Sequence, residues 1–471
     1  MLDCFAARPN ARTVPIRALT TSAYRAWLKK QSKLTQGWLK STDFKAETGR
    51  LALIPARDGS IAVAVLGLGR TPKFWTFAGV RERLPKGRYR YDALAPELAD
   101  TAALAWALSS YRFTRYYDAP SKSAPKLVFP DDCDRATVER TYEAIALGRD
   151  LINTPASDLG PEQLAAAVET LGEQHGAEVT VIAGDALLEE GYPTIHAVGR
   201  AATNGPRLAD LRWGDPEAPK LTLVGKGVCF DSGGLDLKSA TGMKLMKKDM
   251  GGAASVLALA HMIMGANLPV RLRVLIPTVE NSVAGNAYRP GDVLTTRAGI
   301  TVEVGNTDAE GRLIMCDAIA EAVTEEPDLL IDFATLTGAA RIALGTELPA
   351  LFSTDDDFAD AVLGAGKRRT DPLWRMPLHE DYRRHLDSRI ADINNIASVS
   401  QGGAITAALF LKEFVPDGQR WAHVDTMGWN SGNRPGRPNG GEVFGVRAFF
   451  DAIKETLLTP DTESEDADAK S

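Results

Sequence analysis

Residues 221–234 read Leu221-Thr-Leu-Val-Gly-Lys-Gly-Val-Cys-Phe-Asp-Ser-Gly-Gly234, an apolar run that stops at two glycines flanking a lysine. The apolar start predicts a buried strand, and the glycines beside Lys226 let other backbone approach closely. Asp231 then precedes a second glycine pair, and Lys238 and Asp249 follow in the same segment. The pattern is that of a glycine-rich turn after a strand. For each charged residue alone, an ordinary surface position is the simpler interpretation.

Similar apolar runs recur along the chain and alternate with helical patterns. They predict strands over 178–182, 221–224, 272–276 and 329–333, and helices over 253–264, 311–323 and 405–414. Strands that are apolar on both faces and alternate with helices indicate a mostly parallel sheet flanked by helices. In such α/β sheets, reactive groups gather in the loops at the carboxyl ends of the strands.

A second unusual stretch is Asn306-Thr-Asp-Ala-Glu-Gly-Arg-Leu313. Asp308, Glu310 and Arg312 alternate, so an extended segment would point all three side chains the same way. The amphipathic run after Gly311 predicts a helix, whose first amides favour a nearby anion. Two neighbouring carboxylates repel each other unless a cation or a proton lies between them. The stretch therefore indicates either a cation site or a solvated capping loop with a local ion pair.

The length of 471 residues favours two domains over one core. Expected strands (13–19, 50–54, 61–68, 127–130) and helices (24–34, 99–111) predict a smaller N-terminal α/β domain over 1–134. A helical linker is expected over 135–155, ended by Asn153-Thr154-Pro155. A larger α/β domain, with the mostly parallel sheet flanked by helices, is expected over 156–458. The acidic residues 459–471 are expected to be a disordered tail.

Charge is distributed unevenly along the chain. Residues 1–150 contain 25 Lys and Arg against 15 Asp and Glu, a net charge of +10, so the remainder carries −17 of the overall −7. The basic part could attract nucleic acid or acidic neighbours, and the acidic part could be a solvated surface or hold carboxylates around metal. No apolar run approaches a membrane span, and the first 20 residues do not resemble a secretory signal. Four scattered cysteines suit a reducing, cytoplasmic environment.

Other functional motifs fail on inspection. Pro72 and Phe230 occupy the third glycine positions of the two possible dinucleotide-binding loops. No phosphate-binding GxxxxGK[ST] motif occurs. His379-Glu380 begins like a zinc-protease helix, but position 383 is Arg. The six histidines are scattered, which argues against a histidine-built metal site, and His423 is expected in a buried strand.

Taken together, the two stretches resemble the leucyl aminopeptidase family, also called cytosol aminopeptidases. The octapeptide from Asn306 to Leu313 is highly specific to that family, and the GKG-x-x-FDSGG run with its downstream lysine and aspartate also matches in order and spacing. Further agreement lies in the runs NTPA (153–156), YRPGD (288–292), DFATLTG (332–338) and GGAIT (402–406). The resemblance covers about residues 151–453, and the N-terminal part resembles the family only in its size and α/β character.

The resemblance implies a dinuclear metallopeptidase that removes the N-terminal residue from peptides. By position, Asp231 and Glu310 would bridge two divalent cations, Lys226 and Asp249 would complete one site, and Asp308 the other. Lys238 and Arg312 would be the catalytic pair. Lys238 would stabilise the oxyanion that forms when a metal-bridging water attacks, and Arg312 would hold a bicarbonate as general base. Carboxylate-rich sites suit cations such as Zn²⁺ and Mn²⁺.

The resemblance also implies the substrate pocket and the assembly. The residues implied in substrate binding are Met246, Asn306, Thr335, Leu336, Gly338 and Ala339. The apolar character of Met246, Thr335, Gly338 and Ala339 suggests a preference for leucine-like residues. The family forms hexamers, which implies a homohexamer here.

Two alternatives stay open. The basic N-terminal part could bind DNA, although no recognised nucleic-acid motif accompanies it and the overall pI near 5.6 opposes it. The same metal site could also serve a dipeptidase selective for glycine-containing or cysteinyl-glycine substrates.

Overall fold

The computed structural model describes residues 1–117 and 124–458. The expected tail over 459–471 lies outside these residues. The described chain divides into one unit of Met1–Ala146 with Gly432–Asn439, and a second of Leu147–Ser431 with the residues from Gly440 onward. The segment 432–439 returns to the first unit, which the sequence did not indicate. Among the described residues, no helix is long and apolar enough to cross a membrane.

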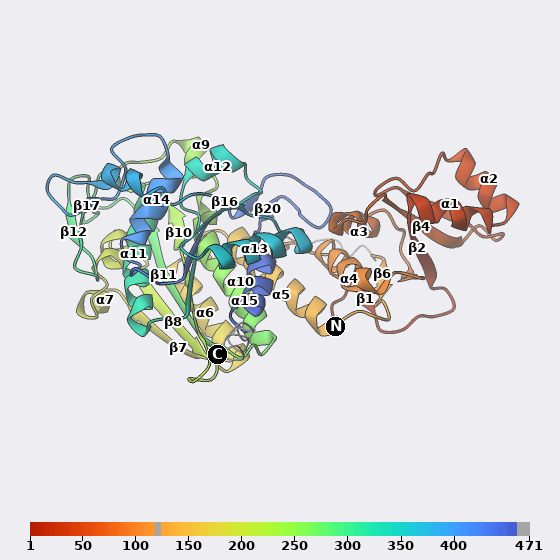
Figure 1. Cartoon of the computed structure of the whole chain (residues 1–471), viewed down its shortest axis with the longest axis horizontal. Helices are drawn as coiled ribbons and strands as arrows, with labels where there is room; N and C mark the ends of the chain where they lie inside the picture. The colour runs from red at the N-terminus through yellow and green to blue at the C-terminus, as the bar shows by residue number, and fades with distance from the viewer. Residues whose placement is uncertain (118–123, 459–471) are drawn as a thin grey trace, which may run out of the picture. The chain divides into compact units, whose positions relative to one another are not determined.

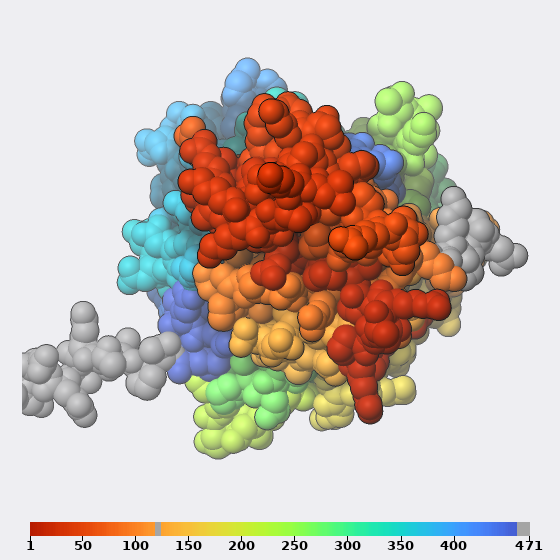
Figure 2. All heavy atoms as spheres, turned by 90° about the vertical axis from the view of Figure 1, so that its right-hand side faces the viewer, coloured from red at the N-terminus to blue at the C-terminus, as the bar shows by residue number. Residues whose placement is uncertain are grey.

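The first unit is an α/β structure around a six-stranded sheet, drawn in red to orange in Figures 1 and 2. The strand order is β1-β6-β5-β2-β4-β3, and neighbouring strands run parallel except β3 and β4, which are antiparallel. Its strands are β1 (Phe5–Ala6), β2 (Val14–Thr20), β3 (Leu51–Pro55), β4 (Ile61–Gly69), β5 (Arg88–Tyr91) and β6 (Lys126–Val128). Its helices are α1 (Thr21–Lys29), α2 (Lys33–Ser41), α3 (Phe74–Arg81) and α4 (Ala99–Leu108).

The single helix expected over 24–34 is wrong, because α1 and α2 share that range. Helix α1 ends at its C-cap Lys30. Ser32 then caps α2, and its hydroxyl accepts a hydrogen bond from the backbone N–H of Thr35 at 3.2 Å. A capping serine satisfies an amide that has no partner inside the helix, so it starts a new helix where apolar periodicity alone suggests continuation.

The second unit is built on a nine-stranded sheet with the order β16-β15-β18-β14-β9-β11-β8-β7, and β10 pairs with β11 beyond β9 (Figure 1). The central strands β18, β14, β9 and β11 run parallel, whereas β7, β8 and β15 pair antiparallel at the sides. The strands are β7 (Glu178–Ala183), β8 (Arg207–Trp213), β9 (Lys220–Gly225), β10 (Gly227–Asp231), β11 (Arg271–Asn281), β14 (Leu329–Ala334), β15 (Ala350–Ser353), β16 (Trp374–Arg375) and β18 (Trp421–Asp425). The mostly parallel α/β fold is confirmed.

Two smaller sheets and a series of helices complete this unit. The small strands are β12 (Val293–Thr295), β13 (Thr301–Glu303), β17 (Ile393–Asn394), β19 (Trp429–Asn430) and β20 (Gly440–Gly441). The α-helices are α6 (Pro161–His175), α7 (Ala186–Glu189), α8 (Pro193–Gly199), α9 (Ala240–Met243), α10 (Gly251–Gly265), α11 (Glu310–Ala322), α12 (Gly338–Leu344), α13 (Asp356–Arg369), α14 (Gly403–Lys412) and α15 (Val446–Thr456). Helix α5 (Arg135–Asn153) occupies most of the range predicted as a linker and ends before Pro155.

Helices cover both faces of the large sheet, as the alternation of apolar residues along β14 shows. Leu330 belongs to a core shared with Leu313 of α11 and Leu409 of α14. Phe333 points to the other face, where its ring lies 5.0 Å from that of Phe449 in α15. Both faces of a central strand are therefore buried, as expected for a parallel sheet between helices.

Candidate metal centre

The charged residues of the two unusual stretches follow the ends of neighbouring strands. Lys226 comes directly after β9, and Asp231 is the last residue of β10. Asp249 lies in the 3₁₀ helix η2 (Met246–Met250), which leads into α10. The carboxyl ends of parallel strands meet at one edge of a sheet, so the fold gathers these groups in one place.

Lys226 lies at the centre of one half of the cluster. Its Nζ is 2.7 Å from Asp249 Oδ2 and 2.9 Å from Glu310 Oε1, and it donates to the carbonyl oxygen of Thr335 at 3.0 Å. Gly311 leaves room for this side chain, since a Cβ there would lie 2.4 Å from Lys226 Cε and 2.6 Å from Nζ. Gly311 of the octapeptide therefore leaves the space that Lys226 of the first stretch occupies.

Lys238 lies at the centre of the other half. Its Nζ is 2.7 Å from Asp231 Oδ2 and also pairs with Asp308 Oδ1. The side chain of Lys238 is 14% exposed and that of Asp308 34%, whereas that of Asp231 is 4% exposed. This half of the cluster is therefore the one that opens toward solvent.

The carboxylates of Asp231, Asp308 and Glu310 together fit a divalent cation. One ligand oxygen from each lies within 4.8 Å of the others. Glu310 Oε2 is buried and has no hydrogen-bond partner among the described residues. A buried carboxylate oxygen without a donor is costly unless a cation completes it, and three oxygens at this spacing supply such a site.

The electrostatics of the cluster favour binding of positive charge. Burial, together with the carboxylates of Asp231 and Asp249, raises the pKa of Glu310 well above its usual value. Burial and the nearby Asp249 likewise raise the pKa of Asp231. Divalent cations would relieve this repulsion and hold both side chains in the charged form.

The pKa of Lys226 shows how strongly the carboxylates act. Burial alone would lower it, but Asp249 and Glu310 outweigh burial and raise the pKa above the usual lysine value. Lys226 is therefore an ammonium beside these carboxylates. It can become a ligand only if a bound cation displaces its proton.

Arg312 is placed differently from the other candidates. Its Nη1 donates to the carbonyl oxygen of Asn395 at 2.6 Å, and its guanidinium lies 5.7 Å from the centre of the Phe410 ring. Its Nε is buried without a hydrogen-bond partner among the described residues. Burial lowers its pKa to about 10, so Arg312 remains a cation at neutral pH, with N–H groups available to an anion.

The extended arrangement expected for Asp308, Glu310 and Arg312 is wrong. Helix α11 begins at Glu310, one residue before the expected start, so successive side chains turn around the helix. Glu310 consequently contacts Lys226, whereas Arg312 reaches Asn395. Asp308 remains in the preceding loop, where its N–H donates to Asn306 Oδ1 at 2.7 Å.

Of the residues expected to bind substrate, Thr335 contacts Asp249 directly. Thr335 Oγ1 lies 2.9 Å from both the carbonyl oxygen and Oδ1 of Asp249. Met246 begins the same 3₁₀ helix and is 8% exposed. Leu336 follows Thr335, and its N–H donates to Asp425 Oδ1 at 3.0 Å. Gly338 and Ala339 form the first turn of α12.

Two asparagines of this cluster escaped sequence reasoning. Asn281, at the end of β11, donates from Nδ2 to Asp231 Oδ1 at 2.9 Å and to the carbonyl oxygen of Thr307 at 3.0 Å. Asn395 accepts from Arg312 and donates from Nδ2 to the carbonyl oxygen of Asn306 at 2.8 Å. Asn281 lies five residues past the end of the strand predicted over 272–276, so the pattern did not indicate it, and nothing around Asn395 marks that residue either.

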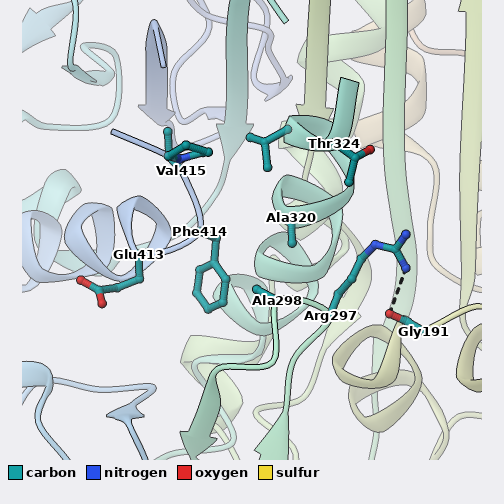
Figure 3. A pocket seen from close by; sticks show the side chains of 10 residues that line it. Gly191, Arg297, Ala298, Ala320, Thr324, Glu413, Phe414 and Val415 are labelled. Atoms are coloured by element: carbon teal, nitrogen blue, oxygen red, sulfur yellow. Dashed lines mark hydrogen bonds between the residues drawn. The ribbon is translucent and has the colours of Figure 1, made fainter. Parts of the chain in front are cut away.

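A separate pocket lies where α11 and α14 end (Figure 3). Arg297 at its wall donates to the carbonyl oxygen of Gly191 at 3.2 Å. The other residues that line it are Ala298, Ala320, Val323, Thr324, Glu413, Phe414, Val415 and Pro416. The lining includes none of the clustered carboxylates, so this pocket is distinct from the metal centre.

A mostly parallel α/β sheet carrying buried carboxylates and two lysines at its strand ends defines a metal-dependent enzyme of the α/β class. Comparison with known protein families supports this class. Residues 146–450 match the cytosol aminopeptidase family, catalytic domain, and residues 14–130 match the M17 aminopeptidase N-terminal domain. The chain belongs to the cytosol aminopeptidase family and is a metalloaminopeptidase, which confirms the predicted resemblance.

Individual relatives are similar in sequence to this chain over most of its length. A probable cytosol aminopeptidase of Nocardia farcinica is 39% identical over 444 residues, covering 87% of this chain and 86% of the relative. One from Rhodococcus opacus is 42% identical over 378 residues, covering 75% and 74%.

Solved structures are also similar to this chain over nearly its whole length. The crystal structure of cytosol aminopeptidase from Coxiella burnetii is 47% identical with a TM-score of 0.92, covering 97% of this chain and 100% of that one. The bottromycin maturation enzyme BotP in complex with Mn is 35% identical with a TM-score of 0.85, covering 94% and 99%.

Proposed function

We propose that this aminopeptidase uses two divalent cations, Zn²⁺ or Mn²⁺, to remove leucine-like residues from peptides with a free N-terminus. The single observation that carries the proposal is the set of oxygens from Asp231, Asp308 and Glu310 within 4.8 Å of one another. The cations, when bound, would polarise the scissile carbonyl and supply an activated bridging water as the nucleophile.

The ligand assignment uses the contacts within the cluster. Asp231 and Glu310 would be shared by the two cations, as the family resemblance implies, and repulsion by Asp231 helps to raise the pKa of the buried Glu310. Lys226 and Asp249, 2.7 Å apart, would complete the buried half. Asp308 would complete the half that opens to solvent. Carboxylate oxygens with one amine are ligands that suit borderline cations. A ligand set poor in histidine suits copper or iron less well.

Lys238 would stabilise the oxyanion. It is the more exposed of the two lysines, and its ammonium lies between Asp231 and Asp308 at the open side of the cluster. A fixed positive charge beside a carbonyl that becomes negative lowers the barrier, because it acts more strongly on the transition state than on the substrate.

Arg312 would hold a small anion that accepts a proton, and bicarbonate fits this role. The guanidinium is buried, remains charged, and has an Nε without a partner among the described residues. Arginine itself stays protonated and cannot act as a base, so a bound anion is needed for proton transfer.

The side chain of the substrate's first residue would lie against Met246, Thr335, Gly338 and Ala339, with Asn306 and Leu336 nearby. Thr335 directs its hydroxyl to Asp249, and its methyl group faces Gly251 and Gly428. This lining supports a preference for leucine-like residues. We further propose a homohexamer in the cytoplasm, on the strength of the family resemblance.

Hydrolysis of aminoacyl-p-nitroanilides tests the proposal. The protein loaded with Mn²⁺ or Zn²⁺ should cleave leucyl-p-nitroanilide, lose this activity in a chelator, and leave N-acetyl-leucyl-p-nitroanilide intact. Cleavage of the blocked substrate at the same rate would contradict the need for a free amine. Size-exclusion chromatography with light scattering would measure the assembly.

A further inference from the structure

Asn395 is a buried asparagine that has no role in the chemistry proposed above. It follows directly after β17 and is 0% exposed. Its backbone N–H donates to the carbonyl oxygen of Glu303 in β13 at 2.9 Å, which continues the pairing of β13 with β17. The residue is therefore fixed to the strand that leads into the octapeptide.

The side-chain amide of Asn395 binds the backbone of the loop that contains the octapeptide. Its Oδ1 accepts hydrogen bonds from the N–H of Gly305 at 2.7 Å and from that of Asn306 at 3.2 Å. Its Nδ2 donates to the carbonyl oxygens of Asn306 at 2.8 Å and Ala309 at 3.3 Å. An amide offers two lone pairs and two N–H groups, and all four are used here. One side chain therefore holds the loop on both sides of Asp308.

The backbone carbonyl of Asn395 holds Arg312. It accepts a hydrogen bond from Arg312 Nη1 at 2.6 Å, and the guanidinium lies 5.7 Å from the centre of the Phe410 ring. Arg312 Nε is buried without a hydrogen-bond partner among the described residues, so this part of the guanidinium can bind an anion. The direction in which it points depends on where the carbonyl of Asn395 lies.

The segment around Asn395 packs directly on the backbone of the same loop. A Cβ at Gly305 would lie 2.7 Å from Ile396 Cγ1, so glycine permits this close approach. An aspartate at position 395 would lose both donors, and an alanine would leave four backbone groups without their partner. Buried backbone groups without partners are costly, so the loop would shift to find other partners.

We infer that Asn395 is a positioning residue for the proposed reaction. Its side chain fixes the loop that carries Asp308, and its carbonyl directs Arg312, so the two keep a constant placement relative to each other. The inference rests on the proposed function, because it concerns the anion that Arg312 would hold. Misplacement of a reacting group by about 1 Å can lower a rate about 100-fold, so Asn395 would matter for the rate although it acts through Arg312.

Hydrolysis of leucyl-p-nitroanilide by the Mn²⁺-loaded protein, in decarbonated buffer with increasing bicarbonate, tests this inference. Asn395→Ala should lower kcat without added bicarbonate about 10- to 100-fold, and raise the bicarbonate concentration at half-maximal kcat about tenfold. Its metal content in elemental analysis should equal that of the unmodified protein. Bicarbonate, compared with equal chloride, should raise its thermal unfolding temperature less than that of the unmodified protein. Asn395→Ser serves if Asn395→Ala does not fold.

Asp392→Ala is the matched control, because Asp392 joins the same two segments farther from the site. Its Oδ2 accepts from the N–H of Thr301 at 2.8 Å and from the Thr301 hydroxyl at 2.6 Å. Loss of these bonds loosens the pairing of β13 with β17 and leaves the bonds of Asn395 in place. The variant should keep the kcat and the bicarbonate dependence of the unmodified protein.

A double-variant measurement shows whether Asn395 acts through Arg312. In an Arg312→Met background, Asn395→Ala should lower kcat by no more than about twofold further, because the group that it positions is gone. Independent losses, an unchanged bicarbonate dependence, the same loss in Asp392→Ala, or a loss of metal equal to the loss of activity overturns this inference alone. An unmodified protein that cleaves no leucyl substrate, or whose kcat is equal at every bicarbonate concentration, overturns the proposed chemistry and this inference with it.

Discussion

The side-chain amide of Asn281 holds Asp231 in place, with Nδ2 donating to Oδ1 at 2.9 Å and also to the carbonyl oxygen of Thr307 at 3.0 Å. This one amide joins β10, β11 and the octapeptide loop. The N–H of Gly233 donates to the same oxygen of Asp231 at 2.8 Å, which leaves Oδ2 facing Lys238. Residues that orient a metal ligand in this way contribute to metal affinity.

We therefore predict that Asn281→Ala weakens metal binding about 10- to 100-fold, because Asp231 loses the donor that orients it. Isothermal titration calorimetry of the metal-free protein with Mn²⁺ measures the change in metal affinity. Asn286→Ala is the matched control: its exposed amide donates to the carbonyl oxygen of Arg200. Equal affinities in the two variants would contradict the role of Asn281.

Gly311→Ala tests the fit between the octapeptide and Lys226. The added methyl would lie 2.4 Å from Lys226 Cε, so the lysine must leave its place between Asp249 and Glu310. Alanine favours a helix more than glycine does, which acts in favour of the variant's fold. We nevertheless expect elemental analysis to find less metal bound per chain, because Lys226 is displaced.

Gly364→Ala provides the comparison for that variant, since its methyl would meet only the flexible end of Arg368 in α13. It should stabilise the fold by about 0.5–1 kcal/mol and leave metal content unchanged. Full metal content in Gly311→Ala would show that Lys226 is not held as described.

Lys238→Met should lower kcat about 100- to 1000-fold, because the charge that stabilises the oxyanion is lost. The carboxylates remain, so metal content should stay at the level of the unmodified protein. Kinetics and elemental analysis on the same preparation separate these effects. Unchanged kcat, or a loss of metal equal to the loss of activity, would contradict the assignment.

The pH dependence of stability should reveal the buried pair of His423 and Asp332. His423 Nδ1 lies 2.5 Å from Asp332 Oδ1, and both side chains are fully buried. Burial alone would lower the pKa of His423, but Asp332 outweighs burial and raises it. The unfolded histidine has a pKa of about 6.5. The pair therefore stabilises the fold fully below that pH, and the contribution is lost as pH rises through the folded pKa.

Urea unfolding of the unmodified protein and of Asp332→Asn, from pH 5.5 to pH 9, measures this contribution. The difference in unfolding free energy should be largest below pH 6.5 and shrink at higher pH, by about 1.4 kcal/mol for each unit by which the pKa is raised. A difference that is constant with pH would mean that His423 is neutral in the folded protein.

Much of the fold could be predicted because the central strands have a simple pattern. The strands β9 and β14 are mostly apolar, and helix α10 between them is a long apolar run whose length favours a helix. The break between α1 and α2 was missed because a capping hydrogen bond from Thr35 to Ser32 overrides periodicity. Strand β11 continues to Asn281, five residues past its expected end at 276, because polar residues near a site do not end a strand that still has partners.

For the site, the proximity of most charged residues could be predicted, but several of their contacts could not. Two contiguous motifs contain most of its charged groups, so their proximity could be expected from the ends of parallel strands. The contact of Arg312 with Asn395 could not, because 83 residues separate them and a loop brings them together.

The central claim is that carboxylates and a lysine from distant segments hold two cations for peptide hydrolysis. The most direct measurement titrates the metal-free protein with Mn²⁺ while recording both the bound ions per chain and the hydrolysis of leucyl-p-nitroanilide. We predict that activity rises to its maximum only as the second ion binds. Full activity without metal, or a protein holding two ions that leaves unblocked peptides intact, would contradict this account.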